Sequence, residues 1–469
     1  MKCVLLWVLG LAIALDVAAQ SPVRVDPRVR HQRIEGWGGS LCWWANIVGG
    51  WPESDQEEIC TWITSPAGLN MNLFRFNIGG GDAPGHNHFR KDGGAMPGYR
   101  SAPGTAYNWN ADGHQRAIAL RLKAKCPAAI FEAFANSPPW WMTKSGCSSG
   151  NTNGATNLRE NAYADFADYL TEVVRHYRDA DHLVFRTLEP MNEPDASWWK
   201  ALGKQEGCGV SVHKQILLIR AVHEKLSAKG LLAQTHLSAM DANSLDACLR
   251  TVAGPDGYAA NQVLPLLSQI NTHSYFGSRR QELAQFAAQQ QKRLWQSESG
   301  PLHVAEKGLA NHLVMAQRII TDLRDLGAVA WLDWQLVSER DPHWGLITAD
   351  YGRQTYRRAK SFYVRMQFSR FFKPGYTVIS TPHPATLAAL SPASDTLVVL
   401  ICHLNTASAQ FQLDLSAFAA LGPKAEAFRT SETEDCQSLG NLPLNGKTLH
   451  LTAPARSVTT VIIPVVPGR

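Results

Sequence analysis

Short apolar runs alternate with helical patterns along residues 34–372, and this alternation limits the possible folds more than any other feature. Tyr163, Phe166 and Leu170, for example, share one face of a helix between two strand-like runs. Strands that alternate with helices pair in parallel. The sequence therefore predicts an α/β fold, a (β/α)8 TIM barrel with a parallel inner ring. The eight strand candidates are residues 34–39, 70–79, 129–136, 185–192, 236–242, 269–276, 294–299 and 329–335.

The pattern changes after residue 372, where helical periodicity disappears and short strand patterns are separated by Pro and Gly. Residues 410–416 alternate strictly between apolar and polar side chains. These features predict a side β-sandwich domain over residues 373–469, next to a catalytic barrel over residues 34–372. We expect the N-terminal segment, residues 20–33, to add a strand to this sandwich.

The N-terminus has the pattern of a signal peptide. Lys2 precedes an apolar stretch, residues 4–15, and small residues end at Ala19. The apolar stretch is too short to span a membrane comfortably. We therefore predict a signal peptide over residues 1–19 and a secreted or periplasmic protein, without a membrane anchor after cleavage.

The charge balance argues against a nucleic-acid partner. Lys and Arg number 45 and Asp and Glu number 40, so the excess is 45 − 40 = 5 over 469 residues, and no basic run is present. The chain contains 15 Trp, whose faces suit sugar rings as well as protein cores. We expect a monomer that acts on a polysaccharide or oligosaccharide.

Eight of the nine cysteines follow the predicted signal peptide, and an even number in an exported protein suggests disulfides. Cys402 and Cys436 lie in the same C-terminal region and are the predicted pair, while the connectivity of the others stays open. No Cys-x-x-Cys occurs, and His86 and His88 have no third ligand at a useful spacing. We therefore expect no metal or other cofactor, and a polar or substrate-lining loop at the two histidines.

Two glutamates follow predicted strands at the end where barrel enzymes carry their catalytic groups. Glu193 follows the fourth strand and Glu298 ends the seventh. Cleavage of a glycosidic bond requires such a pair, one carboxyl to protonate the leaving oxygen and one to meet the developing cation. Glu189 lies deeper in the same strand, so we expect it to be structural, with Arg75 as its ion-pair partner.

Five segments together resemble glycoside hydrolase family 30, and they extend over nearly the whole mature chain. The resemblance implies a (β/α)8 barrel with a side β-sandwich, with Glu193 as the general acid/base and Glu298 as the nucleophile of a retaining mechanism. The segments are residues 33–40 (RIEGWGGS), 137–142 (SPPWWM), 192–194 (NEP), 295–298 (WQSE) and 367–371 (QFSRF).

The loops resemble the endo-β-1,6-galactanase branch of the family, which attacks β-1,6-linked galactan side chains of arabinogalactan proteins. The glucosylceramidase, β-1,6-glucanase and glucuronoxylanase branches share the catalytic frame and stay open as alternatives. A glycan-binding barrel without catalysis is a further alternative, although both carboxylates are present.

Several other residues are candidates for substrate contact. The resemblance implies that Asn192 hydrogen-bonds the sugar 2-hydroxyl, although its strand parity is opposite to that of Glu193. It also implies that His273 and Tyr275 support the nucleophile. The remaining candidates are the tryptophans at predicted strand tops, Trp43, Trp44, Trp141 and Trp334, and the loop residue Asp82.

Overall fold

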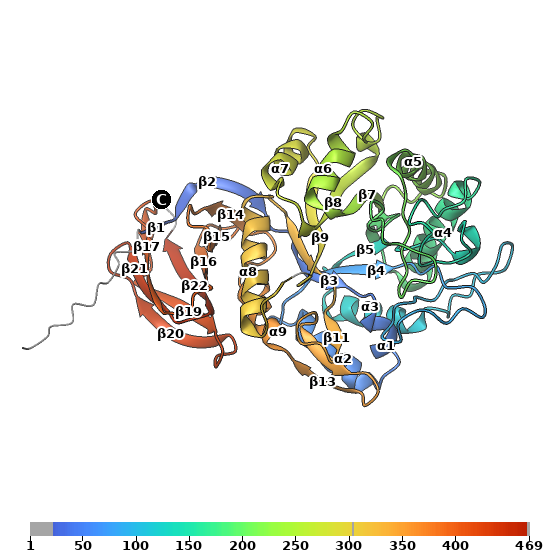
Figure 1. The fold of residues 1–469 in the computed structure, drawn as a ribbon. Coiled ribbons are helices and arrows are strands. Elements are labelled where there is room, and N and C mark those ends of the chain that lie inside the picture. Colours follow the sequence, from blue (N-terminus) through green and yellow to red (C-terminus); the bar gives the residue numbers. More distant parts are fainter. Residues whose placement is uncertain (1–21, 303, 467–469) are drawn as a thin grey trace, which may run out of the picture.

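The computed structural model describes residues 22–302 and 304–466, which form a barrel with a β-sandwich at its side (Figure 1). The predicted signal peptide lies outside the described residues. Eight parallel strands of the described chain close into a barrel in the order β10-β3-β4-β5-β6-β7-β8-β9, which confirms the predicted TIM barrel. Each strand overlaps one predicted range. The barrel strands are β3 (Gly36–Ser40), β4 (Leu73–Asn77), β5 (Ile130–Phe134), β6 (Phe185–Glu189), β7 (His236–Ser244), β8 (Leu267–Phe276), β9 (Arg293–Ser299) and β10 (Ala330–Asp333).

Helices surround the barrel and pack apolar side chains against it. In α4, the predicted face of Tyr163, Phe166 and Leu170 is buried, as its helical spacing requires. No helix in the described ranges is long and apolar enough to cross a membrane. The helices are α1 (Trp44–Val48), α2 (Glu53–Thr64), α3 (Gly113–Lys125), α4 (Tyr163–Asp181), α5 (Val212–Ala228), α6 (Leu245–Ala253), α7 (Arg280–Gln289), α8 (Leu309–Arg324) and α9 (Lys360–Ser369), with short 3-10 helices at η1 (Trp140–Met142) and η2 (Leu264–Leu266).

Two sheets face each other in the sandwich, with strand orders β1-β17-β21 and β2-β14-β15-β16-β22-β19-β20, and β18 pairs with β22. Phe411 and Leu413 of the strictly alternating β17 point into the core between the sheets. β1 and β2 pair with β17 and β14, so the N-terminal segment joins both sheets. A third sheet, β11-β12-β13, follows the barrel. These strands are β1 (Val23–Arg24), β2 (Asp26–Arg33), β11 (Val337–Glu339), β12 (Ile347–Asp350), β13 (Thr355–Arg358), β14 (Thr377–Ser380), β15 (Thr386–Leu390), β16 (Thr396–His403), β17 (Ala409–Asp414), β18 (Ala420–Leu421), β19 (Lys424–Thr430), β20 (Gln437–Pro443), β21 (Thr448–Ala453) and β22 (Ser457–Val466).

The predicted Cys402–Cys436 disulfide is wrong, because both thiols are free in the structure. Cys402 on β16 lies beside Val458 of β22, and Val458 lies beside Thr430 of β19. Two strand spacings, about 9.5 Å, therefore separate Cys402 from Thr430, whose hydroxyl accepts a hydrogen bond from the Cys436 amide. A disulfide needs Cα atoms within about 7 Å. The Cys402 thiol instead donates to the carbonyl of Leu313 on α8, at 3.6 Å.

A buried ion pair joins β10, the last barrel strand, to α9, the helix that packs against β19 and β22 of the sandwich. Arg365 donates two hydrogen bonds to Asp333, from Nε to Oδ2 at 2.9 Å and from Nη2 to Oδ1 at 2.6 Å. The guanidinium also lies over the ring of Trp331, 4.4 Å from its centroid. Both members of the pair are 5% exposed, so neither charge has water as an alternative partner.

We predict that Arg365→Met lowers the free energy of unfolding by about 3–5 kcal/mol, because it leaves the Asp333 carboxylate buried without its cation. Chemical denaturation measures this change. Arg365→Met combined with Asp333→Leu removes both charges and is expected to lose less than the single variant. Equal losses in the single and double variants would contradict the account of this pair.

Candidate active site

A cavity of about 620 Å³ opens at the carboxyl ends of the barrel strands. Glu193 and Glu298 both line it, together with Asn192, Tyr275 and Trp334. Residues from the loops after β4, β5 and β6 form the rest of one wall. The cavity therefore lies where the fold leads us to expect a catalytic site.

The chain beyond β6 brings two neighbouring residues to the cavity. β6 ends at Glu189, so the alternation of the pleat no longer applies at Asn192 and Glu193, and both side chains line the cavity. Glu193 has a φ of 45°, and its amide donates to the carbonyl of Asp241 at 2.9 Å. Because of this turn, Asn192 and Glu193 both reach the cavity, although neighbouring residues of an extended strand would point to opposite sides.

The two cavity carboxyls lie close together. An oxygen of Glu193, an oxygen of Glu298 and a ring nitrogen of His273 all lie within 4.8 Å of one another. His273 Nδ1 is 3.2 Å from Glu193 Oε1 and 3.6 Å from Glu298 Oε1. Paired carboxyls about 5–5.5 Å apart belong to glycosidases that retain configuration, whereas inverting enzymes separate them by about 6.5–9.5 Å. The short spacing here fits retention.

Glu298 has direct contacts that favour its ionised form. Arg75 Nη1 lies 3.2 Å from Glu298 Oε2, and the Tyr275 hydroxyl donates to Glu298 Oε1 at 3.1 Å. Burial nevertheless raises the pKa of Glu298 to about 7, and the Glu193 carboxyl adds to that increase, while His273 and Arg75 oppose it. The pKa of Glu298 therefore lies above its ordinary value in spite of these contacts.

Arg75 is wholly buried inside the barrel, but its partners differ from the predicted one. Besides Glu298, it contacts Asp241 and, at 3.1 Å, Glu132. The predicted pairing with Glu189 is wrong: neither oxygen of Glu189 has a hydrogen-bond partner within the described chain. Burial, with Asp241 and Glu132 nearby, raises the pKa of Glu189 well above its ordinary value, so this carboxyl is neutral.

Asp241 and His273 form a second charged pair beneath the cavity. His273 Nε2 is 3.2 Å from Asp241 Oδ1, which also accepts a hydrogen bond from the Ser297 hydroxyl. Burial would raise the pKa of Asp241, but Arg75 and His273 outweigh it and lower that pKa to about 2. Burial would likewise lower the pKa of His273, but Glu298 and Asp241 raise it well above its ordinary value.

Asn243 is a site residue that the sequence did not predict. Its side-chain amide donates to Glu193 Oε1 at 2.5 Å, and it lines the cavity. Asp241 and Asn243 are polar residues near the end of β7, so the search of strand ends that identified Glu193 could also have found them.

Two of the expected tryptophans do form the cavity wall. Trp43 and Trp334 meet edge to face with ring centroids 5.3 Å apart. Trp198, which is 49% exposed, and Trp344 also line the cavity. Aromatic faces at a wet cavity provide a surface on which a sugar ring can lie.

Four candidate substrate contacts lie elsewhere. Trp44 is fully buried in α1, where its indole donates to the carbonyl of Ser40 at 2.9 Å. His273 is also fully buried, so it supports the carboxyls from behind the cavity. Trp141 and Asp82 lie outside the cavity lining. Strand-top position alone could not separate these residues from Trp43 and Trp334, because adjacent side chains on a loop or short helix point in different directions.

Comparison with known proteins agrees with this geometry. The sequence profile of O-glycosyl hydrolase family 30 matches residues 20–347. An endo-β-1,6-galactanase of Hypocrea rufa is 31% identical over 436 residues, which cover 87% of this chain and 86% of that protein. An exo-β-1,6-galactobiohydrolase of Bifidobacterium longum subsp. longum is 25% identical over 465 residues, which cover 73% of this chain and 30% of that protein.

The fold is also that of a solved family member. The catalytic domain of GH30 xylanase C from Talaromyces cellulolyticus superimposes with a TM-score of 0.74 at 20% identity, covering 95% of this chain and 100% of that one. Three findings lead to one conclusion. Two carboxyls lie at the mouth of the barrel, the family profile matches most of the chain, and a relative is 31% identical along its length. The chain belongs to glycoside hydrolase family 30 and is an O-glycosyl hydrolase.

Proposed function

We propose that the protein is a retaining endo-β-1,6-galactanase, with Glu298 as nucleophile and Glu193 as general acid/base. The observation that carries the mechanism is the approach of the two carboxyls to within 4.8 Å in the cavity. The resemblance to the Hypocrea rufa endo-β-1,6-galactanase over 87% of the chain supports the substrate class. The substrate is a β-1,6-linked galactan side chain of arabinogalactan.

The contacts of the two carboxyls assign their roles. Arg75 and Tyr275 both contact Glu298, and each favours a carboxylate there. His273 contacts both carboxyls and does not distinguish them. These contacts favour Glu298 as the carboxylate that attacks, which leaves Glu193 as the carboxyl that donates the proton.

In the first step, a Glu298 oxygen forms a bond to the anomeric carbon as the bond to the leaving oxygen breaks. Glu193 gives its proton to that leaving oxygen, and the rest of the galactan departs as an alcohol. Positive charge develops on the sugar ring in the transition state, and the Glu298 carboxylate meets it directly. Asn243 and His273 hold the Glu193 carboxyl in place for proton transfer.

In the second step, Glu193 is ionised and accepts a proton from water. The water oxygen bonds to the anomeric carbon, the bond to Glu298 breaks, and the sugar leaves with its original configuration. Asn192 is 4% exposed at the cavity, and its Oδ1 has no hydrogen-bond partner within the described residues. A buried polar atom of this kind favours a sugar hydroxyl as its donor.

We predict an acidic limb near pH 7 in the profile of kcat/KM, because burial and the Glu193 carboxyl raise the pKa of Glu298 to about 7. Below that pH Glu298 is protonated and cannot attack, so activity falls as the pH is lowered. Glu193→Gln, assayed on an aryl glycoside whose leaving group needs no protonation, removes one cause of the raised pKa, so its acidic limb is expected at lower pH. An acidic limb at the same pH in both proteins would contradict the contribution of the Glu193 carboxyl.

The substrate is tested by analysing products from β-1,6-galactan, β-1,6-glucan, glucuronoxylan and glucosylceramide. We expect a range of short galacto-oligosaccharides from the first substrate alone. Glu298→Gln is expected to lose at least about 10⁴-fold in turnover. Glu282→Gln, which makes the same change on the exposed face of α7, is the matched control and is expected to retain full activity.

The other outcomes are equally informative. Products from a different polymer would contradict the substrate and leave the carboxyl pair in place. Release of a single short product from chain ends would contradict endo action. No product from any of the four would contradict the proposed enzyme and favour a glycan-binding barrel.

A further inference from the structure

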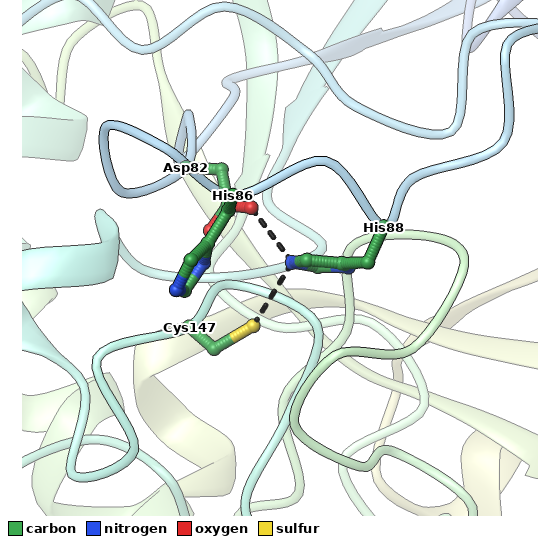
Figure 2. A group of neighbouring side chains, drawn as sticks. All are labelled: Asp82, His86, His88 and Cys147. Carbon is green, nitrogen blue, oxygen red and sulfur yellow. Dashed lines mark hydrogen bonds and ion pairs between the residues drawn. The ribbon is translucent and has the colours of Figure 1, made fainter.

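Four metal-ligating side chains meet beside the active-site cavity. Asp82, His86 and His88 come from the loop after β4, and Cys147 comes from the loop after β5 (Figure 2). One ligand atom of each lies within 4.8 Å of every other. The spacing of His86 and His88 gave no third ligand in the sequence, because Cys147 is 59 positions from His88 along the chain and joins it only through the fold.

His88 has the orientation of a metal ligand. Its Nδ1 faces the carbonyl of Gly203 at 2.5 Å and donates to it. Its Nε2 then points at Asp82 Oδ2, 2.7 Å away, and at Cys147 Sγ, 3.3 Å away (Figure 2). A hydrogen bond from one ring nitrogen to a backbone carbonyl is the usual support of a histidine that binds metal through the other.

Asp82 Oδ2 is left without a hydrogen bond, although it is buried. The nearby Nε2 of His88 is close enough but does not have the geometry of a hydrogen bond to it. The other oxygen, Oδ1, lies 3.1 Å from Nδ1 of His86. A cation bound by both atoms would satisfy this buried oxygen.

Polar groups surround the sulfur of Cys147. The Leu202 amide donates to its Sγ at 3.3 Å, and the Ser149 hydroxyl lies 3.0 Å from the same sulfur. Cys208 and Cys248, by contrast, pack in the apolar core. Polar donors around a buried sulfur provide the outer contacts that a metal-bound thiolate needs.

We infer that Asp82, His86, His88 and Cys147 bind one Zn²⁺ ion. Thiolate, imidazole and carboxylate are the ligands that zinc takes, usually four in a tetrahedron. Bond lengths of about 2.0–2.3 Å place the ligand atoms of such a tetrahedron about 3.3–3.7 Å apart. The separations here, from 2.7 Å to within 4.8 Å, lie on both sides of that range, so small side-chain rotations form the site.

The ion would have a structural role at the cavity. Four protein ligands leave no open position for a reacting water. His88 also holds Gly203 in the loop after β6, so the site joins three loops. Arg90, Ser149 and Lys204 on those loops line the cavity. Zinc would therefore fix the part of the cavity wall that these three loops form.

The test is metal binding by the full mature protein, independent of catalysis. We expect one equivalent of Zn²⁺ by metal analysis after dialysis. Co²⁺ in its place is expected to give the intense visible bands of tetrahedral cobalt and a thiolate charge-transfer band in the near ultraviolet. Zn²⁺ is also expected to raise the Tm, because the metal binds the folded chain only.

Variants locate the site. Cys147→Ser is expected to remove the charge-transfer band. His88→Gln is expected to weaken Co²⁺ binding more than about 100-fold, which exceeds the effect of losing a residue that only supports a ligand. Cys126→Ser, which changes another cysteine outside the cluster, is the matched control and keeps both signals. Glu298→Gln also keeps them, so that failure of the proposed function leaves the metal site standing.

Absence of stoichiometric Zn²⁺ and of tetrahedral Co²⁺ bands in the wild-type protein would overturn the inference, even if every variant failed to fold. Bands that persist in folded Cys147→Ser would place the metal elsewhere and overturn it as well.

Discussion

The guanidinium of Arg75 lies inside the barrel, out of contact with water, and each of its three nitrogens faces a different carboxyl. Burying an unpaired charge costs several kcal/mol. Arg75 is therefore stable inside the barrel only together with its partners, Glu132, Asp241 and Glu298. The barrel provides the required positions, because the partners come from β5, β7 and β9 and point to one interior. Arg75 therefore fixes the position of the Glu298 carboxyl and favours its ionised form.

Asp241 extends this arrangement to the second carboxyl. It contacts Arg75 on one side and His273 on the other, and its backbone carbonyl accepts the amide of Glu193. The nucleophile and the acid/base are therefore positioned by one connected set of charges. Their short separation follows from that set. Burial and the nearby Glu193 carboxyl raise the pKa of Glu298 to about 7, although His273 and Arg75 oppose the increase.

The barrel was predictable because its signals are local and repeated eight times. The ends of the predicted strands also placed Glu193 and Glu298 at the correct edge. Long-range pairing was less accessible. Arg75 is ion-paired as expected, but which carboxyl it meets depends on the stagger between strands rather than on spacing within one strand. The same limit hid the partner of Cys147. It also produced the wrong disulfide, because Cys402 lies on β16 whereas Cys436 follows β19, and β22 lies between these two strands.

The central claim is that Glu298 forms a covalent bond to the sugar while Glu193 supplies the proton. Incubation with a 2-deoxy-2-fluoro-galactoside carrying a good leaving group slows hydrolysis of the glycosyl-enzyme, and mass spectrometry of peptides then locates the label. The account predicts one fluorogalactosyl group on the peptide that contains Glu298. A label on Glu193, or continued turnover with no covalent species in a fully active enzyme, would contradict it.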